Sequence, residues 1–450
     1  MKEMEKNSFL SGKILSSLVH FSVPLMLALL LQALYGGVDL AVVGLFGNAS
    51  ELSAVATGSQ VMQSITVLIS GLTMGVTVLL GQVIGAGDYK KGSCIICGEV
   101  KLFFWIALVI TVFMIFFAKR AAMLMNVPSE ALDKTVLYIR ICSAGVIFIT
   151  AYNGISGIFR AMGNSKAPFI FVLIASVVNI VLDLIFVGLL GFGVSGAAVA
   201  TVLAQCGSVL FSLFYIKRKP LPFKIEKQNF ANSGYKREII KVGLPIALQD
   251  FLVNISFLII TSIINKIGLV ASASIGIAEK LFVFLSIVPV SFMSALSAFV
   301  AQNVGSGNYH RAKKAFWITE GISVPVGVIM FLITFFKGDC LASMFTSDAM
   351  VIDSTRVYLK GCSFEYLLIA VSFCMVGFFN GMGKTRFVML QGLFAAFCVR
   401  IPLSYIFSIM PGGGMFYISL AVPVSAIVSL FFCIIYYIIL MSRLKKTGRI

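Results

Sequence analysis

GQVIGAGDYKKG, residues 81–92, recurs as AQNVGSGNYHRA at residues 301–312. The same offset joins YIRICS at 138 to YLKGCS at 358, and GIFRAMGNSK at 157 to GFFNGMGKTR at 377. Near the start of each half, Pro24 matches Pro245 at almost the same distance. A repeat this regular predicts that the chain contains two copies of one folding unit.

The composition places both copies in a membrane. Hydrophobic residues make up 59% of the chain, charged residues only 12%, and the mean hydropathy is +1.02. Soluble proteins carry about 25% charged residues. Apolar runs of about 20 residues, each long enough to cross the roughly 30 Å hydrocarbon core, recur along the chain. We therefore predict an all-α polytopic membrane protein with twelve spans, at about 18–45, 53–81, 95–117, 135–158, 167–190, 194–216, 243–265, 269–300, 315–336, 355–379, 386–409 and 414–441.

The distribution of charge predicts the topology. Most lysines and arginines fall in the N-terminal segment, the C-terminal segment and alternate loops, which places both termini in the cytoplasm of a cell whose plasma (inner) membrane holds the chain. The net charge of +17 is thus a topological bias and does not indicate a nucleic-acid partner. We predict an N-terminal six-helix lobe at 1–216, a cytoplasmic linker at 217–241 and a C-terminal lobe at 242–450, related as parallel repeats.

Several short motifs suggest other functions, but the residues around them do not support those functions. GMGKT at 381–385 resembles a P-loop, but Phe378 stands where the first glycine belongs, and GAGDY at 85–89 is a fragment of a dinucleotide fingerprint that ends a helix. Cys94 and Cys97 form a CxxC with no second pair nearby, and two histidines do not make a zinc site or a clustered catalytic centre. We expect no enzyme activity and no cofactor, so any pumping draws on an ion gradient.

Polar residues inside the spans of the first half are the candidate site. An ionised group in the bilayer core costs roughly 3 kcal/mol or more. Asp39 in the first span, Asp183 in the fifth and Thr201 in the sixth lie at similar distances from the predicted outer surface, and Asn179 stands one turn from Asp183. Further polar groups accompany them at Gln32 and Tyr35, on the face of Asp39, and at Tyr152 and Asn153 in the fourth span.

Two interpretations of this set remain open. The acids could be protonated and hydrogen-bonded to neighbours, serving only to hold helices together. Alternatively, two close carboxylates exchange a proton, or bind Na⁺ together with amide and hydroxyl oxygens. The repeat favours the second, because Val399 and Leu403 replace Asn179 and Asp183 at the offset of the glycine loops. A set needed only for packing would be expected to recur in both halves.

The second half has membrane charges of its own. Opposite charges at similar depth suggest that they pair with each other, although a direct role in coupling or in substrate contact is the alternative. We regard Lys280 as the most readily functional of the set, which comprises Asp250, Glu279, Lys280, Glu365 and Arg400.

With these features in place, the chain resembles the multidrug and toxic compound extrusion (MATE) family over nearly its whole length. The resemblance rests on the two six-helix halves, on Pro24 with QALYGGVD at 32–39, on the paired glycine loops, on RAMGNSKAP and NGMGKTRF, and on VRIPL at 399–403. It implies a V-shaped transporter, acting as a monomer, that exports amphipathic or cationic small molecules in exchange for H⁺ or Na⁺.

The resemblance also implies roles for particular residues. Family members hold a first-lobe cation at positions that are Asp39, Asn179, Asp183 and Thr201 here, and Gln32, Tyr35 and Asn153 fit the same pattern. Some branches add acids in spans 7 and 10, where this chain has Val253 and Ile369. This difference favours the branch whose coupling lies in the first lobe, in which a basic residue like Lys280 recurs in span 8.

Other transport classes fit less well. A major-facilitator transporter would need a different basic motif between spans 2 and 3, and a channel would not need buried acids in one half only. The nearest alternative is a flippase of a lipid-linked saccharide or another amphipathic lipid in the same superfamily.

Overall fold

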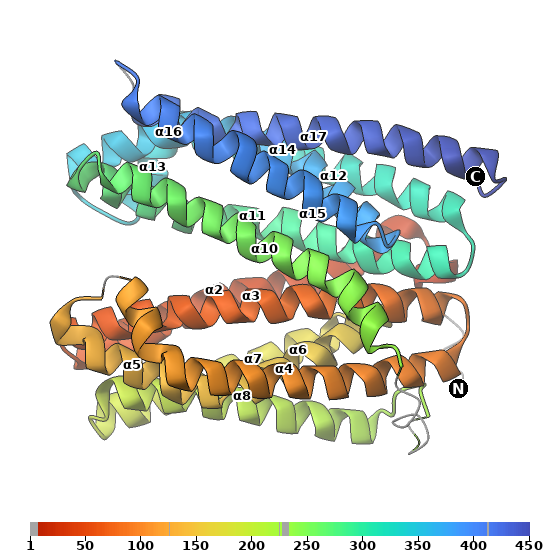
Figure 1. The fold of residues 1–450 in the computed structure, drawn as a ribbon, viewed down its shortest axis with the longest axis horizontal. Helices are drawn as coiled ribbons and strands as arrows, with labels where there is room; N and C mark the ends of the chain where they lie inside the picture. The colour runs from red at the N-terminus through yellow and green to blue at the C-terminus, as the bar shows by residue number, and fades with distance from the viewer. Residues whose placement is uncertain (1–7, 126, 225, 227–233, 412–413) are drawn as a thin grey trace. The chain divides into compact units, whose positions relative to one another are not determined.

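The computed structural model describes residues 8–125, 127–224, 226, 234–411 and 414–450, and every regular element in these residues is helical. Much of the predicted linker, at 225 and 227–233, lies outside the described residues. The elements, shown in Figure 1, are α1 Ser8–Ser11, α2 Ile14–Phe46, α3 Ala49–Gly85, α4 Tyr89–Leu124, α5 Ser129–Ala144, α6 Val146–Ala161, α7 Lys166–Asp183, η2 Leu184–Leu189, α8 Gly193–Arg218, α10 Lys236–Asn265, α11 Leu269–Gly305, α12 Tyr309–Phe336, α13 Gly338–Ser343, α14 Ala349–Gly381, α15 Thr385–Leu393, η3 Phe394–Arg400, α16 Ile401–Ile409 and α17 Met415–Lys446.

The helices confirm the predicted all-α membrane architecture. Eleven of the helical segments in the described part of the chain are long and apolar enough to cross a membrane, and one bent pair supplies the twelfth. Proline stands inside several of them, as in α2, α10 and α17. Membrane helices tolerate proline because neighbouring groups satisfy the backbone atoms that it frees.

The bent pair is the predicted fourth span. Here α5 and α6 meet at Gly145 with a bend of 47°. A Cβ at Gly145 would lie 2.6 Å from Cγ2 of Val202 on α8, so only glycine allows this approach. At the same position of the repeat the second half has Glu365, and there α14 continues unbroken.

The chain divides into two compact units. Residues 23–247 form one, called the first lobe below, and residues 248–450 together with 8–22 form the other, the second lobe. The divisions fall inside α2 and inside α10, next to Pro24 and Pro245. The start of α10 therefore belongs to the first lobe, and the start of α2 belongs to the second.

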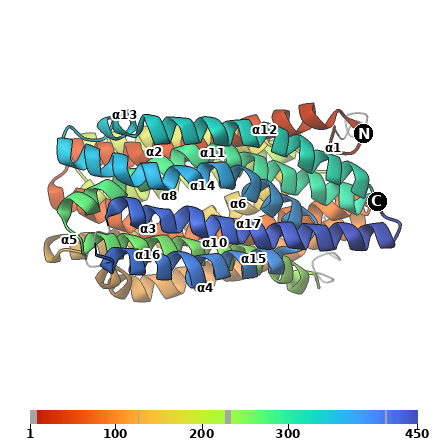
Figure 2. The same ribbon diagram turned by 90° about the horizontal axis from the view of Figure 1, so that it is seen from above.

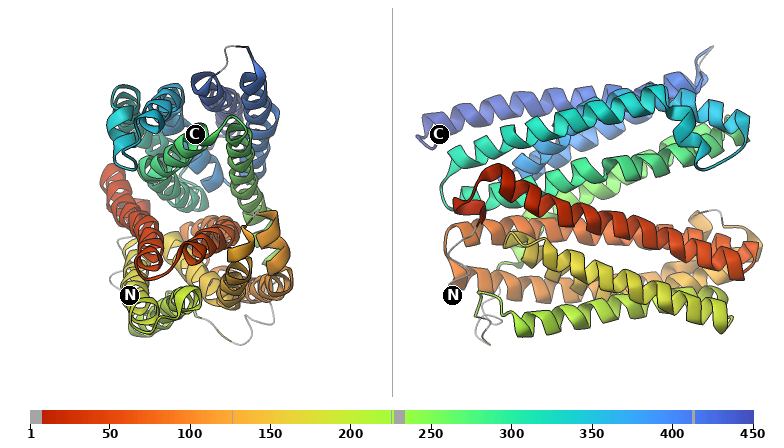
Figure 3. Two further views of the ribbon diagram at one scale, coloured as in Figure 1. Left: turned by 90° about the vertical axis from the view of Figure 1, so that its left-hand side faces the viewer. Right: turned by 180° about the vertical axis from the view of Figure 1, so that it is seen from behind.

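Long helices build each lobe around one central helix. In the first lobe α3 contacts α4, α5, α6 and α8, while α7 packs along α8 (Figure 3). In the second lobe α14 takes the central place and contacts α11, α12 and α17 (Figure 2). The apolar core of the first lobe includes Val43, Ile69 and Ile139, and that of the second includes Ile264, Ile275 and Leu359.

The outer helices expose large apolar side chains, as expected for surfaces that face lipid. On α4, Trp105, Val109, Phe113 and Phe116 are all exposed, Phe116 to 76%. In water such a continuous apolar face would be an aggregation liability. In a bilayer it is the ordinary surface of a spanning helix.

The repeated glycine loops end one helix and begin the next in both lobes. Gly87 and Gly307 adopt φ values of +74° and +77°, which glycine reaches without strain. The next residue then caps the following helix, because Asp88 accepts from the amide of Lys91 at 3.0 Å and Asn308 accepts from the amide of Arg311 at 3.0 Å. The predicted helix end at Gly87 is confirmed.

Small residues let α3 approach the start of α10 closely. A Cβ at Gly75 would lie 2.3 Å from Cα of Gly243, and one at Gly71 would lie 2.4 Å from Cα of Ala247. These contacts involve the backbone of α10, so no side chain can rotate away to make room. Close approach of this kind stabilises helix pairs in membranes through van der Waals packing.

We predict that Gly75→Val destabilises the protein. The valine side chain overlaps the α10 backbone, which forces the helices apart and costs about 1–3 kcal/mol. The measurement is the midpoint of thermal unfolding in detergent. Gly207→Val on α8 is the matched control, since a Cβ there meets nothing within 4 Å. Equal midpoints for the two variants would show that the close approach of α3 to α10 contributes no stability.

Candidate cation site in the first lobe

Four polar residues of the first lobe converge from three helices. Asp39 lies on α2, Asn179 and Asp183 lie on the last turns of α7, and Thr201 lies on α8. The structure places the Asp39 carboxylate beside the side chains of the other three. Asp39, Asn179 and Asp183 are 6%, 2% and 0% exposed. Two carboxylates and an amide therefore share one buried volume within the lobe.

Most polar atoms of the two acids and the amide in this cluster lack a direct hydrogen bond, whereas the hydroxyl of Thr201 donates to the carbonyl of Ala197 at 3.0 Å. Within the described residues, Oδ1 of Asp39, both carboxylate oxygens of Asp183 and both amide atoms of Asn179 are buried without a hydrogen-bond partner. Each such atom costs about 1–3 kcal/mol if nothing satisfies it. Several oxygens that face one another without bonding directly suit a shared proton or a hard cation that bridges them.

A π-helical turn follows the cluster directly. η2 starts at the residue after Asp183, and the amide of Leu190 donates to the carbonyl of Ile185 at 2.9 Å. Such turns insert an extra residue into a helix and are frequent at functional sites. The turn rotates the residues beyond Asp183 relative to the α7 face that presents Asn179 and Asp183.

The structure adds Tyr138 to the cluster, which the sequence analysis missed. Tyr138 on α5 is 2% exposed and lies beside Asp39, Thr201 and Cys142. Its ring occupies the space that a Cβ at Gly58 would need, at 2.4 Å. The repeat of YIRICS as YLKGCS could have drawn attention to this tyrosine, because both halves keep it.

The polar residues predicted to accompany the cluster, Gln32, Tyr35, Tyr152 and Asn153, are our candidates for the substrate cavity, and three of them lie close to one another. Tyr35 is half-buried and neighbours both Asp39 and Tyr152, while Gln32 is exposed and lies beside Tyr152. Asn153 is less available, because its Nδ2 donates to the carbonyl of Ile149 at 2.8 Å within its own helix.

A third buried acid of the first lobe, Glu99, lies outside this cluster. Glu99 on α4 is 2% exposed, and both its oxygens lack a hydrogen-bond partner among the described residues, as does Nε of Arg160 on α6. The two charges influence each other, and Arg160 also neighbours Tyr152. The sequence carried a signal for Glu99, since it stands inside a predicted span, as Glu320 does in the second half.

The second-lobe charges gather around Tyr358, the repeat partner of Tyr138. Glu279 and Glu365 both neighbour Tyr358, and Thr261 donates a hydrogen bond to Glu279. Arg400 lies near the same group. Three of the five predicted residues thus come together. None of the three stands at the position that matches Asp39 or Asp183 in the repeat.

Arg400 is held by neutral groups. Its Nε donates to Oγ of Ser425 at 3.0 Å, and its guanidinium lies 4.6 Å from the ring centre of Phe257. In the part of the chain that the structure describes, the ion pairs are Lys134–Glu51 and Arg356–Asp353, so the pairing expected among the second-lobe charges does not occur there as a direct contact.

The two remaining second-lobe candidates stand apart from that group. Lys280 is exposed, and Asp250 is half-buried without a charged neighbour among the described residues. The same residues contain no group of three His, Cys, Asp or Glu side chains placed to hold a metal ion.

Comparison with known proteins identifies the fold. The MatE family profile matches residues 24–185 and again 245–406, which is most of the chain and one match for each half. The protein belongs to the MATE family. Members of this family are transporters and not enzymes, and the helices described above make the chain an integral membrane protein.

Relatives and solved structures cover almost the whole chain. The probable multidrug resistance protein YpnP of Bacillus subtilis is 28% identical over 90% of this chain and 91% of its own. The multidrug export protein MepA of Staphylococcus haemolyticus is 24% identical over 96% of each. A MATE protein in a bent conformation superposes with a TM-score of 0.92 at 22% identity, over 99% of both chains.

We predict that Asp183→Leu stabilises the protein. Leucine is the residue at the same repeat position, Leu403, and it removes a buried carboxylate that no described group satisfies. The gain is about 1–3 kcal/mol, measured as a higher midpoint of thermal unfolding in detergent.

Asn179→Val, which copies Val399, is a parallel variant one turn away on α7. It is expected to shift the midpoint upward by a smaller amount, because an amide is cheaper to bury than a carboxylate. A clear loss of stability in Asp183→Leu would mean that the protein itself satisfies this carboxylate.

Proposed function

We propose that the protein is a secondary exporter of amphipathic or cationic small molecules, driven by exchange for H⁺ or Na⁺ at Asp39, Asn179, Asp183 and Thr201. The observation that carries the proposal is the cluster of buried polar atoms in the first lobe that lack hydrogen-bond partners among the described residues. At the same repeat positions the second lobe has Val399 and Leu403, so the scaffold itself does not require these groups.

The chemistry of the cluster supports exchange of a cation. Two carboxylates in an apolar bundle repel each other when both are ionised, and a proton or a Na⁺ between them relieves the repulsion. The amide oxygen of Asn179 and the hydroxyl of Thr201 add neutral oxygen ligands, which suit a hard cation. A cation therefore stabilises the closed cluster, and its departure leaves charge that favours opening to water.

The position of the aromatic residues links this cluster to substrate. Tyr35 lies between Asp39 and Tyr152, and Gln32 lies at the exposed end of the same group. A substrate that stacks on the tyrosines or bonds to Gln32 would sense the charge on Asp39 directly. YpnP and MepA, which are named for multidrug resistance and export, support small amphipathic molecules as the substrate class.

In the second lobe a fixed cation, Arg400, already lies near the acids that surround Tyr358. Arg400 and Glu365 lie around Tyr358, where Tyr138 faces the acids in the first lobe. A fixed guanidinium needs no ion from solution. This arrangement favours the branch of the family whose coupling resides in the first lobe, with Lys280 and Asp250 as further candidates for contact with substrate.

A lipid flippase remains the second candidate. A transporter from Pyrococcus furiosus, described as having reverse polarity of its binding pocket and a different function, superposes with a TM-score of 0.91 at 22% identity. The fold alone therefore does not distinguish drug export from movement of an amphipathic lipid. The acidic residues of the first lobe favour export of cationic compounds.

The test is transport in proteoliposomes with the pH gradient and the Na⁺ gradient imposed separately. We expect one of the two gradients to drive accumulation of a fluorescent organic cation. Asp39→Asn and Asp183→Asn are each expected to reduce this transport at least tenfold, because an amide can neither release a proton nor neutralise Na⁺.

Asp133→Asn is the control, since it removes an acid that is exposed outside the predicted spans. Its transport should match that of the unmodified protein. Wild-type rates in both site variants would exclude the proposed coupling site. The flippase would be favoured if neither gradient moved the cation but a labelled lipid-linked saccharide moved in a gradient-dependent way.

A further inference from the structure

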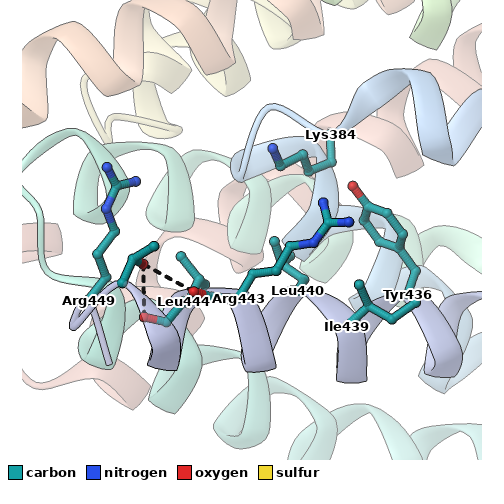
Figure 4. Close-up of a pocket in the computed structure, with 8 residues that line it drawn as sticks. Lys384, Tyr436, Ile439, Leu440, Arg443, Leu444 and Arg449 are labelled. Atoms are coloured by element: carbon teal, nitrogen blue, oxygen red, sulfur yellow. Dashed lines mark hydrogen bonds between the residues drawn. The ribbon is translucent and has the colours of Figure 1, made fainter.

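A basic hollow lies at one end of the second lobe, between the start of α15 and the end of α17. Its volume is about 190 Å³. Arg443 and Arg449 extend from the end of α17 and the residues after it, on the side where Lys384 lies (Figure 4). The hollow is lined by Lys384, Tyr436, Ile439, Leu440, Arg443, Leu444, Thr447 and Arg449.

The lining carries three positive charges and no acid. The ion pairs in the described residues involve none of Lys384, Arg443 and Arg449. Arg449 is nevertheless held in place, because its Nη1 donates to the hydroxyl of Tyr309 at 3.2 Å and its guanidinium lies 5.5 Å from the centre of that ring. Cations gathered without counter-charges repel one another unless an anion joins them.

The repeat shows that the lysine of this hollow is specific to the second lobe. Gly163 and Gly383 adopt the same turn, with φ values of +78° and +71°. In the first lobe the next residue, Asn164, caps the following helix by accepting from the amide of Ala167 at 3.2 Å. In the second lobe that position is Lys384, and α15 begins without a side-chain cap or an acid in its first turn. The first amides of α15 therefore add to the positive potential.

The rest of the lining is mostly apolar. Leu440 and Leu444 are each 7% exposed and form its floor, while Ile439 is 42% exposed beside them. Tyr436 is fixed by stacking on Phe387, with ring centres 3.8 Å apart. A soluble phosphate would use the cations alone. A membrane lipid has a charged headgroup that matches the basic residues of the lining and acyl chains that match its apolar residues.

We propose that this hollow binds the phosphate headgroup of an anionic membrane lipid. The phosphate is held by Lys384 and Arg443, with Arg449 at the outer side, and the start of an acyl chain lies along Ile439 and Leu440. Arg443 stands in the basic last turn of a spanning helix, at the level where headgroups lie. Basic pockets between membrane helices bind anionic lipids in this way.

The experiment is native mass spectrometry of the full-length protein in detergent, with dioleoyl phosphatidylglycerol and dioleoyl phosphatidylcholine added in turn. We expect the unmodified protein to retain phosphatidylglycerol in preference to phosphatidylcholine. The double variant Lys384→Gln/Arg443→Gln should retain at least threefold less phosphatidylglycerol, because both charges that hold the phosphate are gone.

The matched control is Lys445→Gln/Lys446→Gln, which also removes two positive charges. Both are in the last turn of α17, as Arg443 is, but neither lines the hollow. It should retain phosphatidylglycerol as the unmodified protein does. An equal loss in both double variants would overturn the proposal, since binding would then follow total charge. If the double variant does not fold, the single changes Lys384→Gln and Arg443→Gln are each expected to lose part of the binding, and no loss in either would refute the site.

Inorganic phosphate is the third probe. At millimolar concentration it should leave the retained phosphatidylglycerol unchanged, because it makes no apolar contacts. Complete displacement would show that the hollow takes soluble phosphate and would overturn the assignment to lipid. All three arms measure binding to purified protein, so their outcome is independent of whether the chain exports drugs.

Discussion

A polar group inside the hydrocarbon of a membrane has to be satisfied within the protein, and this constraint organises the whole molecule. The backbone meets it by forming helices. Side-chain hydroxyls meet it by donating back to their own helix, as Thr73 does to the carbonyl of Ile69 at 2.8 Å and Thr150 to that of Val146 at 2.8 Å. Ionised carboxylates such as those of Asp39 and Asp183 have no donor of their own and cannot use this route, so they need a donor, a proton or an ion from elsewhere.

The two lobes place acids and a guanidinium inside their helices at different positions. In the first lobe Asp39 and Asp183 lie together and Arg160 lies near Glu99, while in the second lobe Arg400 is held on Ser425 and Phe257 near Glu365. At the end of the second lobe, Lys384 stands where the first lobe has Asn164, and it adds a positive charge to the lining of the basic hollow. In both cases the scaffold is shared and single side chains set the chemistry of each lobe.

The sequence was sufficient to predict the features that depend on long-range averages. Hydropathy averaged over the length of a span located the spans, and the offset of the glycine loops showed the two halves. The features that depend on tertiary contact could not be predicted. At the break, Val202 of another helix occupies the place that a side chain at Gly145 would need. Tyr138 lies beside the acids because α5 packs against α3 at Gly58 and against α8. The residues around Tyr138 in the sequence do not predict this packing.

The charged residues of the second lobe show the same limit in another form. The second-lobe candidates have opposite charges at similar predicted depth, which suggests that they pair with one another. In the structure the guanidinium of Arg400 instead donates to Ser425 and lies over the ring of Phe257. Depth along a helix can be counted from sequence, whereas direction around it changes with every π-helical turn.

The gapless register between the halves has a consequence for the history and the engineering of this chain. From Gly81 to Lys166, each position has a partner at the same offset in the segment from Ala301 to Arg386, even where one half breaks a helix and the other continues it. After the duplication that produced them, the halves diverged here by substitution alone. Segments could therefore be exchanged between the halves without adding or deleting a residue, and chimaeras of this kind would place each half's own side chains on its sister's scaffold.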